Sequence, residues 1–237
     1  MRPREECTRR EFVQITGQAA LVAGLTLSTS GLVHAAPPKK PDAVLAKLME
    51  GNARFVQGQP SLLSRRRPAD FLPLAEGQTP DAVIVSCADS RVPPELLFDQ
   101  GVGDLFVVRI AGNIVSGGGP TVKGSIEYAV AELGSRLIMV LGHSQCGAVQ
   151  AAIQHIDAKD VLPGEIDALI DPIRPVVTAI KGHPGDKLEN AIRANVLAGV
   201  ERLKALDPII AKHVKAGELK VVGAVYDLKT GSVNLLS

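Results

Sequence analysis

This chain has few aromatic residues and a small net charge. It has 237 residues and no tryptophan, and aromatic residues make up only 3% of it. Base-stacking platforms, sugar-stacking clefts and broad aromatic binding surfaces would therefore be poorly supplied. The formal net charge is +1 at pH 7 with histidine neutral, so no strong field of one sign is available to attract a nucleic acid. We expect a small-molecule substrate and no nucleic-acid partner.

Cysteine is also rare. The chain has three, Cys7, Cys87 and Cys146, which are too few for a disulfide framework in a protein of this size. Metal binding or chemical reactivity is therefore the role to expect for them. Apolar residues, by contrast, make up 46% of the chain, enough for one substantial hydrophobic core.

The first 36 residues resemble a twin-arginine export signal. Arg9-Arg10 precede a mostly apolar stretch over 15–33, and small residues follow at Ala35-Ala36. Glycines and polar residues interrupt the apolar stretch, which disfavours a stable membrane-spanning helix. We expect cleavage near Ala35-Ala36, export to the periplasm, and a single mature domain over 37–237 without stable membrane insertion. A basic amphipathic helix and an uncleaved anchor are the alternatives.

Short apolar runs alternate with helical patterns along the rest of the chain. Runs rich in Val and Ile are typical of buried parallel strands. The predicted strands are 82–86, 105–110, 137–141 and 219–225, and the predicted helices are 42–57, 94–98, 122–133, 146–156, 189–206 and 207–215. Asp42 is the expected N-cap of the first helix, and 60–80 is expected to be mostly loop. This alternation indicates an α/β fold with a mostly parallel central sheet flanked by helices.

Three candidate metal ligands stand at the ends of two predicted strands. Cys87 directly follows one strand, and His143 follows another with a single residue between. Because ligands bind at the carboxyl ends of parallel strands where the strand order switches, these two side chains can converge. Cys146, three residues after His143, can reach the same point from a helix start. Two thiolates and one imidazole suit Zn²⁺ and leave a fourth position for water. Core thiols with a loop histidine, or a purely structural zinc, would give the same pattern.

A carboxylate and a guanidinium follow Cys87 closely. Asp89 comes two residues later and Arg91 two further on, so all three can project from one loop. An aspartate paired with arginine stays ionised near neutral pH, and it can then only accept hydrogen bonds. Such a pair could orient a protonated oxygen at the metal. A turn capped by Asp89 and tethered by Arg91, without catalysis, is the alternative.

Four segments resemble the signature segments of β-class carbonic anhydrases and occur in that family's order. They are 87–93 (CADSRVP), 106–113 (FVVRIAGN), 125–129 (SIEYA) and 142–147 (GHSQCG), and the similarity extends from 50–55 to 222–227. It therefore covers nearly the whole mature chain and points to the plant-like subgroup. The resemblance implies a zinc enzyme that reversibly hydrates CO₂ to bicarbonate and a proton.

The resemblance also implies roles for particular residues. Cys87, His143 and Cys146 would bind Zn²⁺, and zinc-bound hydroxide would attack CO₂. Asp89 and Arg91 would form the catalytic dyad that orients the hydroxide. In a closed state, Asp89 would instead become the fourth metal ligand and occupy the position of the water.

A substrate pocket at a subunit interface is implied as well. Gln78 would bind bicarbonate, and Phe106 and Tyr128 would line the pocket across the interface. A homodimer or a dimer of dimers is implied, with an N-terminal helical arm packed on the partner. Plain core packing is the alternative for Phe106 and Tyr128.

One departure from the family concerns regulation. The bicarbonate-inhibited subgroup has tryptophan three residues before the first cysteine, where this chain has Ile84. That noncatalytic bicarbonate site is therefore expected to be missing. Arg109 matches an arginine of the same site, but its place in a predicted strand favours a structural role.

Two other functions fit the same residues: a CS₂ or COS hydrolase on this scaffold, and a non-catalytic zinc-stabilised module. For a carbonic anhydrase, two thiolates would cancel the charge of Zn²⁺, so the metal should acidify water less than a site of three neutral histidines. Activity is then expected to rise toward alkaline pH. His155, His183 and His213 are candidate proton carriers, although solvated surface residues are the simpler interpretation.

Overall fold

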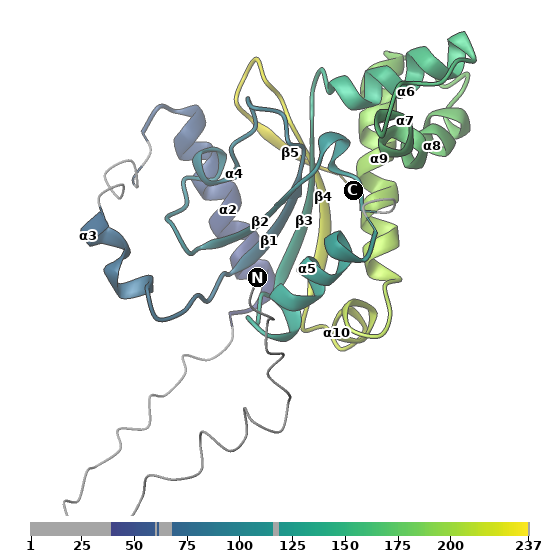
Figure 1. Cartoon of the computed structure of the whole chain (residues 1–237). Coiled ribbons are helices and arrows are strands. Elements are labelled where there is room, and N and C mark those ends of the chain that lie inside the picture. The colour runs from purple at the N-terminus through teal and green to yellow at the C-terminus, as the bar shows by residue number, and fades with distance from the viewer. Residues whose placement is uncertain (1–38, 60, 62–67, 116–118, 237) are drawn as a thin grey trace, which may run out of the picture. The chain divides into compact units, whose positions relative to one another are not determined.

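Five strands form one sheet in the order β2-β1-β3-β4-β5 (Figure 1). They are β1 (Ala82–Ser86), β2 (Leu105–Arg109), β3 (Leu137–His143), β4 (Lys220–Tyr226) and β5 (Val233–Leu236). All neighbouring pairs are parallel except β4 and β5. The mostly parallel sheet flanked by helices is thus confirmed, and β5 is a strand that the sequence does not predict.

The computed structural model describes residues 39–59, 61, 68–115 and 119–236. The predicted export signal over 1–36 lies outside the described residues. Within the described part of the chain, no helix is both long enough and apolar enough to span a bilayer.

The switch in strand order lies between β1 and β3. From β1 the chain moves outward to β2, and it then returns to the other side of β1 to form β3. Crossovers on opposite sides of one strand pair leave a crevice at the carboxyl ends of those strands. Any side chain that follows β1 or ends β3 is therefore delivered to this crevice.

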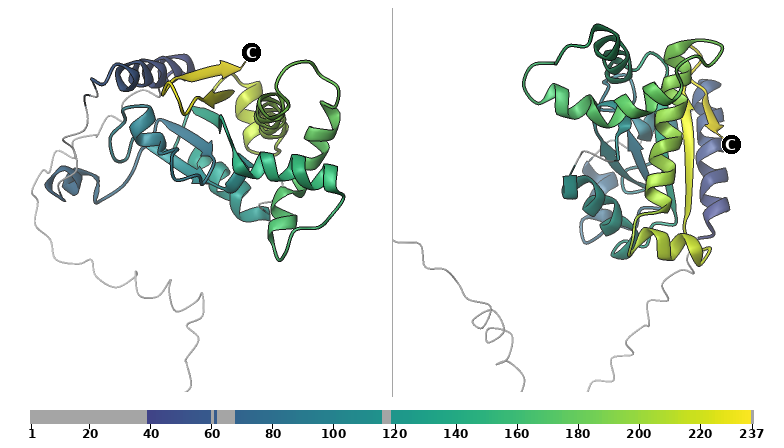
Figure 2. Two further views of the ribbon diagram at one scale, coloured as in Figure 1. Left: turned by 90° about the horizontal axis from the view of Figure 1, so that it is seen from above. Right: turned by 90° about the vertical axis from the view of Figure 1, so that its right-hand side faces the viewer.

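Both faces of the sheet are covered, which explains the uninterrupted apolar runs of β1 and β3. Alternate residues such as Val83 and Val140 pack against α5 (Gly119–Ala131), α9 (Lys187–Lys204) and α10 (Ile210–Lys215). The intervening residues pack against α2 (Pro41–Val56) and α4 (Pro94–Leu97). Figure 2 shows α2, in purple, and α9, in light green, on opposite sides of the sheet.

Helix α2 approaches α4 very closely at Gly51. A Cβ atom on Gly51 would lie 1.8 Å from the carbonyl oxygen of Phe98, so only glycine fits. The next residue, Asn52, is buried and donates from Nδ2 to the carbonyl oxygens of Leu97 and Gly231 at 3.0 Å each. Its Oδ1 accepts from the Val233 amide at 2.8 Å. These bonds tie α2 to α4 and to the start of β5.

The prediction that Asp42 caps the first helix was wrong. Helix α2 begins at Pro41, its N-cap is Lys40, and no side chain makes a capping hydrogen bond. Proline is well suited to the first helical position because its missing N–H needs no partner there. Asp42 lies inside the first turn and accepts a hydrogen bond from Lys220 Nζ at 2.6 Å.

Two regions contain short helices that the sequence does not predict. Between the predicted helices at 146–156 and 189–206, the chain forms α7 (Ile166–Ile170), η3 (Asp171–Ile173) and α8 (Arg174–Ala179). They pack with α6 (Gly147–Ala158) in a third apolar cluster that also contains Cys87 and Cys146. The predicted loop over 60–80 includes α3 (Pro68–Phe71) and η1 (Leu72–Leu74).

Candidate metal centre

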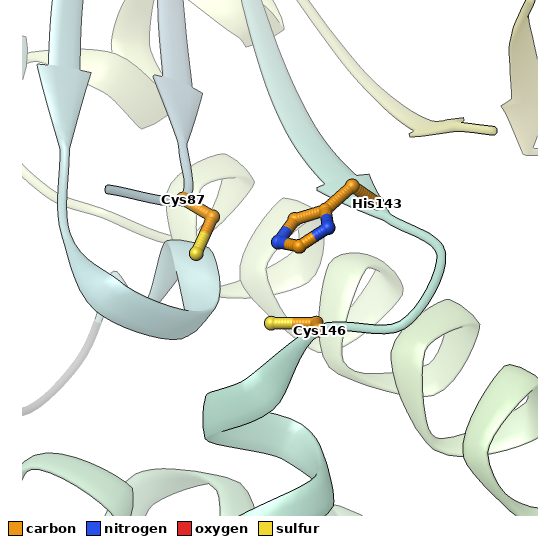
Figure 3. Close-up of side chains that lie close together, drawn as sticks. All are labelled: Cys87, His143 and Cys146. Carbon is orange, nitrogen blue, oxygen red and sulfur yellow. The ribbon is translucent and has the colours of Figure 1, made fainter. Parts of the chain in front are cut away.

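The fold brings Cys87, His143 and Cys146 together at the carboxyl ends of β1 and β3. Cys87 directly follows β1, His143 is the last residue of β3, and Cys146 is the N-cap of α6. Their ligand atoms all lie within 4.8 Å of one another, and all three residues are buried. Figure 3 shows the two sulfurs and the imidazole ring directed toward a common point. The predicted convergence of these side chains is confirmed.

The imidazole of His143 is oriented as a metal ligand. Its Nδ1 lies 2.9 Å from the carbonyl oxygen of Ser144, which can only accept, so Nδ1 carries the hydrogen. This leaves the lone pair on Nε2, and that atom is buried without a hydrogen-bond partner. A buried polar atom without a partner costs free energy, and a metal ion would satisfy this one.

The surroundings of the two thiols favour the thiolate form of Cys87 over that of Cys146. The neighbouring Cys146 thiol and the Gly112 amide lower the pKa of Cys87 against the effect of burial. The neighbouring Cys87 and burial raise the pKa of Cys146. The Gly112 amide donates to the Cys87 sulfur at 3.3 Å. Thiolate and neutral imidazole donors are the set that Zn²⁺ prefers, so these residues fit zinc.

Asp89 and Arg91 form a two-point ion pair beside this group. Arg91 donates from Nε to Oδ1 at 2.9 Å and from Nη2 to Oδ2 at 2.7 Å. The hydrogen bonds from the Arg91 side chain hold the pKa of Asp89 well below its usual range. Oδ2 of Asp89 also lies 3.8 Å from Nε2 of His143, so an ionised carboxylate borders the candidate metal position. The backbone N–H of Arg91 donates to Oδ1 of the same carboxylate at 2.9 Å. Asp89 thus caps the turn and Arg91 tethers it, a geometry that the catalytic and the non-catalytic interpretations share.

Arg109 fixes the loop that carries both Cys87 and Asp89. At the end of β2, it donates from Nε to the carbonyl oxygen of Cys87 at 3.1 Å and from Nη2 to that of Asp89 at 2.6 Å. These contacts agree with the structural role predicted for Arg109.

Two of the three predicted substrate-pocket residues contact each other. Gln78 is exposed in the segment before β1. Phe106 on β2 and Tyr128 on α5 pack together with ring centroids 6.4 Å apart, and Tyr128 is 49% exposed. Among the described residues, no hydrogen bond, ion pair or ring contact joins these three to Cys87, His143 or Cys146. Phe106 and Tyr128 are thus in contact, and Gln78 contacts neither of them through a hydrogen bond or ring contact among the described residues.

Two residues without a predicted role support the candidate ligands through the backbone. The carbonyl of Ser144 fixes the His143 ring, and the amide of Gly112 contacts Cys87. Backbone groups leave no side-chain signature in a sequence. The only sequence feature that could indicate this turn is the glycine at position 112. Its φ is +76°, a conformation that favours glycine.

Together, a mostly parallel sheet in an α/β fold and a buried Cys-His-Cys group at its switch point define a metalloenzyme-type centre suited to zinc. Residues 82–233 match the family described as carbonic anhydrase, which is more than half of the chain. The chain belongs to the β-class carbonic anhydrase family.

Individual relatives agree with this assignment. The carbonic anhydrase of Mycolicibacterium smegmatis is 39% identical over 204 residues, covering 85% of this chain and 96% of the relative. That of Pseudomonas aeruginosa is 40% identical over 173 residues, covering 70% and 77%. The solved β-carbonic anhydrase CcaA has a TM-score of 0.65 at 31% identity and covers 81% of this chain and 95% of its own. A tetrameric β-carbonic anhydrase of Sordaria macrospora scores 0.64 at 27% identity, covering 82% and 98%.

Proposed function

We propose that this protein reversibly hydrates CO₂ to bicarbonate and a proton at a zinc ion held by Cys87, His143 and Cys146. One observation carries the proposal. In a chain of the β-carbonic anhydrase family, three soft or borderline donors converge within 4.8 Å, and one of them has a buried nitrogen without a partner.

Zinc supplies Lewis acidity at such a site and lowers the pKa of a coordinated water. The chain's own residues direct that chemistry. Asp89, kept ionised by Arg91, can only accept a hydrogen bond. It therefore selects an oxygen that still carries a proton and leaves a lone pair of that oxygen free to face CO₂. Arg109 keeps Asp89 beside Cys87 by holding the loop between them.

The Asp89–Arg91 pair also favours an open site over a closed one. Both carboxylate oxygens of Asp89 accept from Arg91, so the carboxylate faces the guanidinium. Asp89 as a fourth ligand belongs to a closed state reached only when that pair breaks. This arrangement supports catalysis better than a permanently closed zinc-stabilised module.

The substrate pocket is proposed to form with a second subunit, as in the plant-like subgroup. Gln78 would bind bicarbonate, and Phe106 and Tyr128 would line the pocket. Exposed Gln78 and half-exposed Tyr128 support this, because a partner would cover them. The Sordaria macrospora relative is described as tetrameric. Analytical ultracentrifugation should show a dimer or a dimer of dimers, and Tyr128→Asp should shift it toward monomer. A wild-type monomer would contradict the proposal.

Export is a separate proposal that rests on the first 36 residues. The arginine pair Arg9-Arg10 and the following apolar stretch support a twin-arginine signal that delivers the protein to the periplasm. A folded reporter fused behind residues 1–36 should reach the periplasm. Replacing Arg9-Arg10 by two lysines should retain it in the cytoplasm. Equal export of both fusions would show that the pair is not the signal.

The experiment for the catalytic proposal compares substrates on one preparation. Zinc-loaded protein is assayed for CO₂ hydration by stopped flow and for CS₂ and COS hydrolysis, with Cys87→Ala of verified folding as the control. We expect rapid CO₂ hydration that is lost in the control. Hydrolysis of CS₂ or COS without CO₂ hydration would assign the site to that other chemistry.

A further inference from the structure

A tight turn after β2 supplies the hydrogen bond to the Cys87 sulfur. This turn is η2 (Ala111–Asn113), and its Gly112 has φ +76° and ψ 14°. A Cβ at Gly112 would lie 2.9 Å from Cδ1 of Ile173 and 3.2 Å from the Cβ of Ala148. The turn is thus closely packed on the side where a side chain of residue 112 would stand, and the Gly112 amide donates to the Cys87 sulfur at 3.3 Å.

The same turn also accepts a hydrogen bond from Asn195 of α9. Its Nδ2 donates to the carbonyl oxygen of Gly112 at 2.8 Å, across 83 positions of sequence. Asn195 is only 3% exposed and lies on the apolar face of α9, next to buried Val196. A buried amide is costly without a partner, and here the Gly112 carbonyl provides one.

Helix α9, which carries Asn195, is held in place by packing on the sheet and by an N-cap. It has 18 residues and packs along both β3 and β4. Its N-cap is formed by Asp186, whose side chain accepts from the Glu189 amide. Asn195 therefore connects a helix anchored on the sheet to the turn beside the candidate zinc ligand.

We infer that Asn195 is a positioning residue of the metal centre. By fixing the Gly112 carbonyl, its amide keeps the N–H of the same residue directed at the Cys87 sulfur. An N–H···S bond stabilises negative charge on a thiolate and fixes the direction in which the sulfur faces the metal. Asn195 touches neither metal nor substrate and acts only through Gly112. This inference rests on the proposed zinc site.

The test measures metal binding in two variants and one matched control. Asn195→Ala removes the amide, and Asn195→Asp keeps its size but cannot donate to the carbonyl when ionised. Val200→Ala makes a cavity on the same buried face of α9 without changing the contact to Gly112. For each folded protein, zinc affinity is measured by chelator competition, and the thiolate-to-metal absorption bands are recorded after Co²⁺ substitution.

We expect both Asn195 variants to bind zinc about 10-fold more weakly or worse, the usual effect of losing support around a metal ligand. Their cobalt bands should shift, whereas Val200→Ala should match the wild type in both measurements. If Asn195→Ala does not fold, Asn195→Asp decides. Wild-type affinity and cobalt bands in the folded Asn195 variants would overturn this inference alone. Failure of the wild type to bind zinc would overturn the proposed function as well.

Discussion

Arg91 donates two hydrogen bonds to the Asp89 carboxylate, from Nε to Oδ1 at 2.9 Å and from Nη2 to Oδ2 at 2.7 Å. This fork is the strong form of an arginine–carboxylate contact because it adds direction to charge. Oδ2 of the same carboxylate lies 3.8 Å from Nε2 of His143. Arg91 thus keeps Asp89 ionised and fixes the orientation of its carboxylate group.

Loss of Arg91 should therefore slow catalysis without unfolding the protein. In Arg91→Ala, Asp89 loses the partner that lowers its pKa and can turn toward the metal. We expect kcat to fall by about 10- to 100-fold, as for other residues that support metal sites. The control is Arg174→Ala, which breaks a similar pair with Asp167. Equal activity of Arg91→Ala and Arg174→Ala in stopped-flow assays would show that the Arg91 fork has no catalytic part.

The Asp167–Arg174 pair predicts a pH-dependent contribution to stability. Hydrogen bonds from Arg174 lower the pKa of Asp167. A folded-state pKa below the unfolded value stabilises the protein above the unfolded pKa of about 3.9, and this contribution is lost as pH falls through the folded pKa. Arg174→Ala should therefore lower Tm at neutral pH, with a difference from wild type that shrinks in acid. A difference in Tm that grows on acidification would contradict this assignment.

Gly51 should tolerate no side chain at all. Gly51→Ala would place Cβ 1.8 Å from the Phe98 carbonyl oxygen and push α2 away from α4, at a cost of about 1–3 kcal/mol or more in unfolding free energy. The matched control is Gly124→Ala at an exposed position of α5, where a Cβ meets nothing within 4 Å. There, higher helix propensity should stabilise the protein by up to about 1 kcal/mol. Urea denaturation should show a lower free energy of unfolding for Gly51→Ala and a higher one for Gly124→Ala than for the wild type. Equal changes in the two variants would contradict this.

The donor set predicts the pH profile of catalysis. Two thiolates would cancel the charge of Zn²⁺, so the metal acidifies water less than it would among neutral histidines. We expect kcat for CO₂ hydration to rise from mildly acidic to alkaline pH. A flat profile over that range would contradict this reasoning.

The four parallel strands β1 to β4 and the metal group could be predicted because each depends on local sequence. Strand β1 (Ala82–Ser86) is a run of small and β-branched residues buried on both faces, and this pattern fixes its ends. Once the strands are located in the sequence, Cys87 and His143 are seen to stand at the ends of β1 and β3. The convergence of their side chains follows from parallel pairing across β1 and β3.

The parts that could not be predicted depend on contacts between distant segments. Strand β5 has two exposed residues among four, and its pairing with β4 depends partly on Asn52 of α2. Asn195 is a polar residue within a helical pattern, and its partner Gly112 is 83 positions away. Asp42 fits a capping pattern, but Pro41 starts the helix before it.

The most direct test of the account is X-ray absorption at the zinc edge of the zinc-loaded wild type. We expect one zinc ion with two sulfur ligands at about 2.3 Å, together with one imidazole nitrogen and one further light atom at about 2.0–2.1 Å. Cys146→Ala should lose one of the two sulfurs. Zinc without sulfur ligands, or no bound zinc in the folded protein, would contradict the assignment of Cys87, His143 and Cys146 as the metal centre.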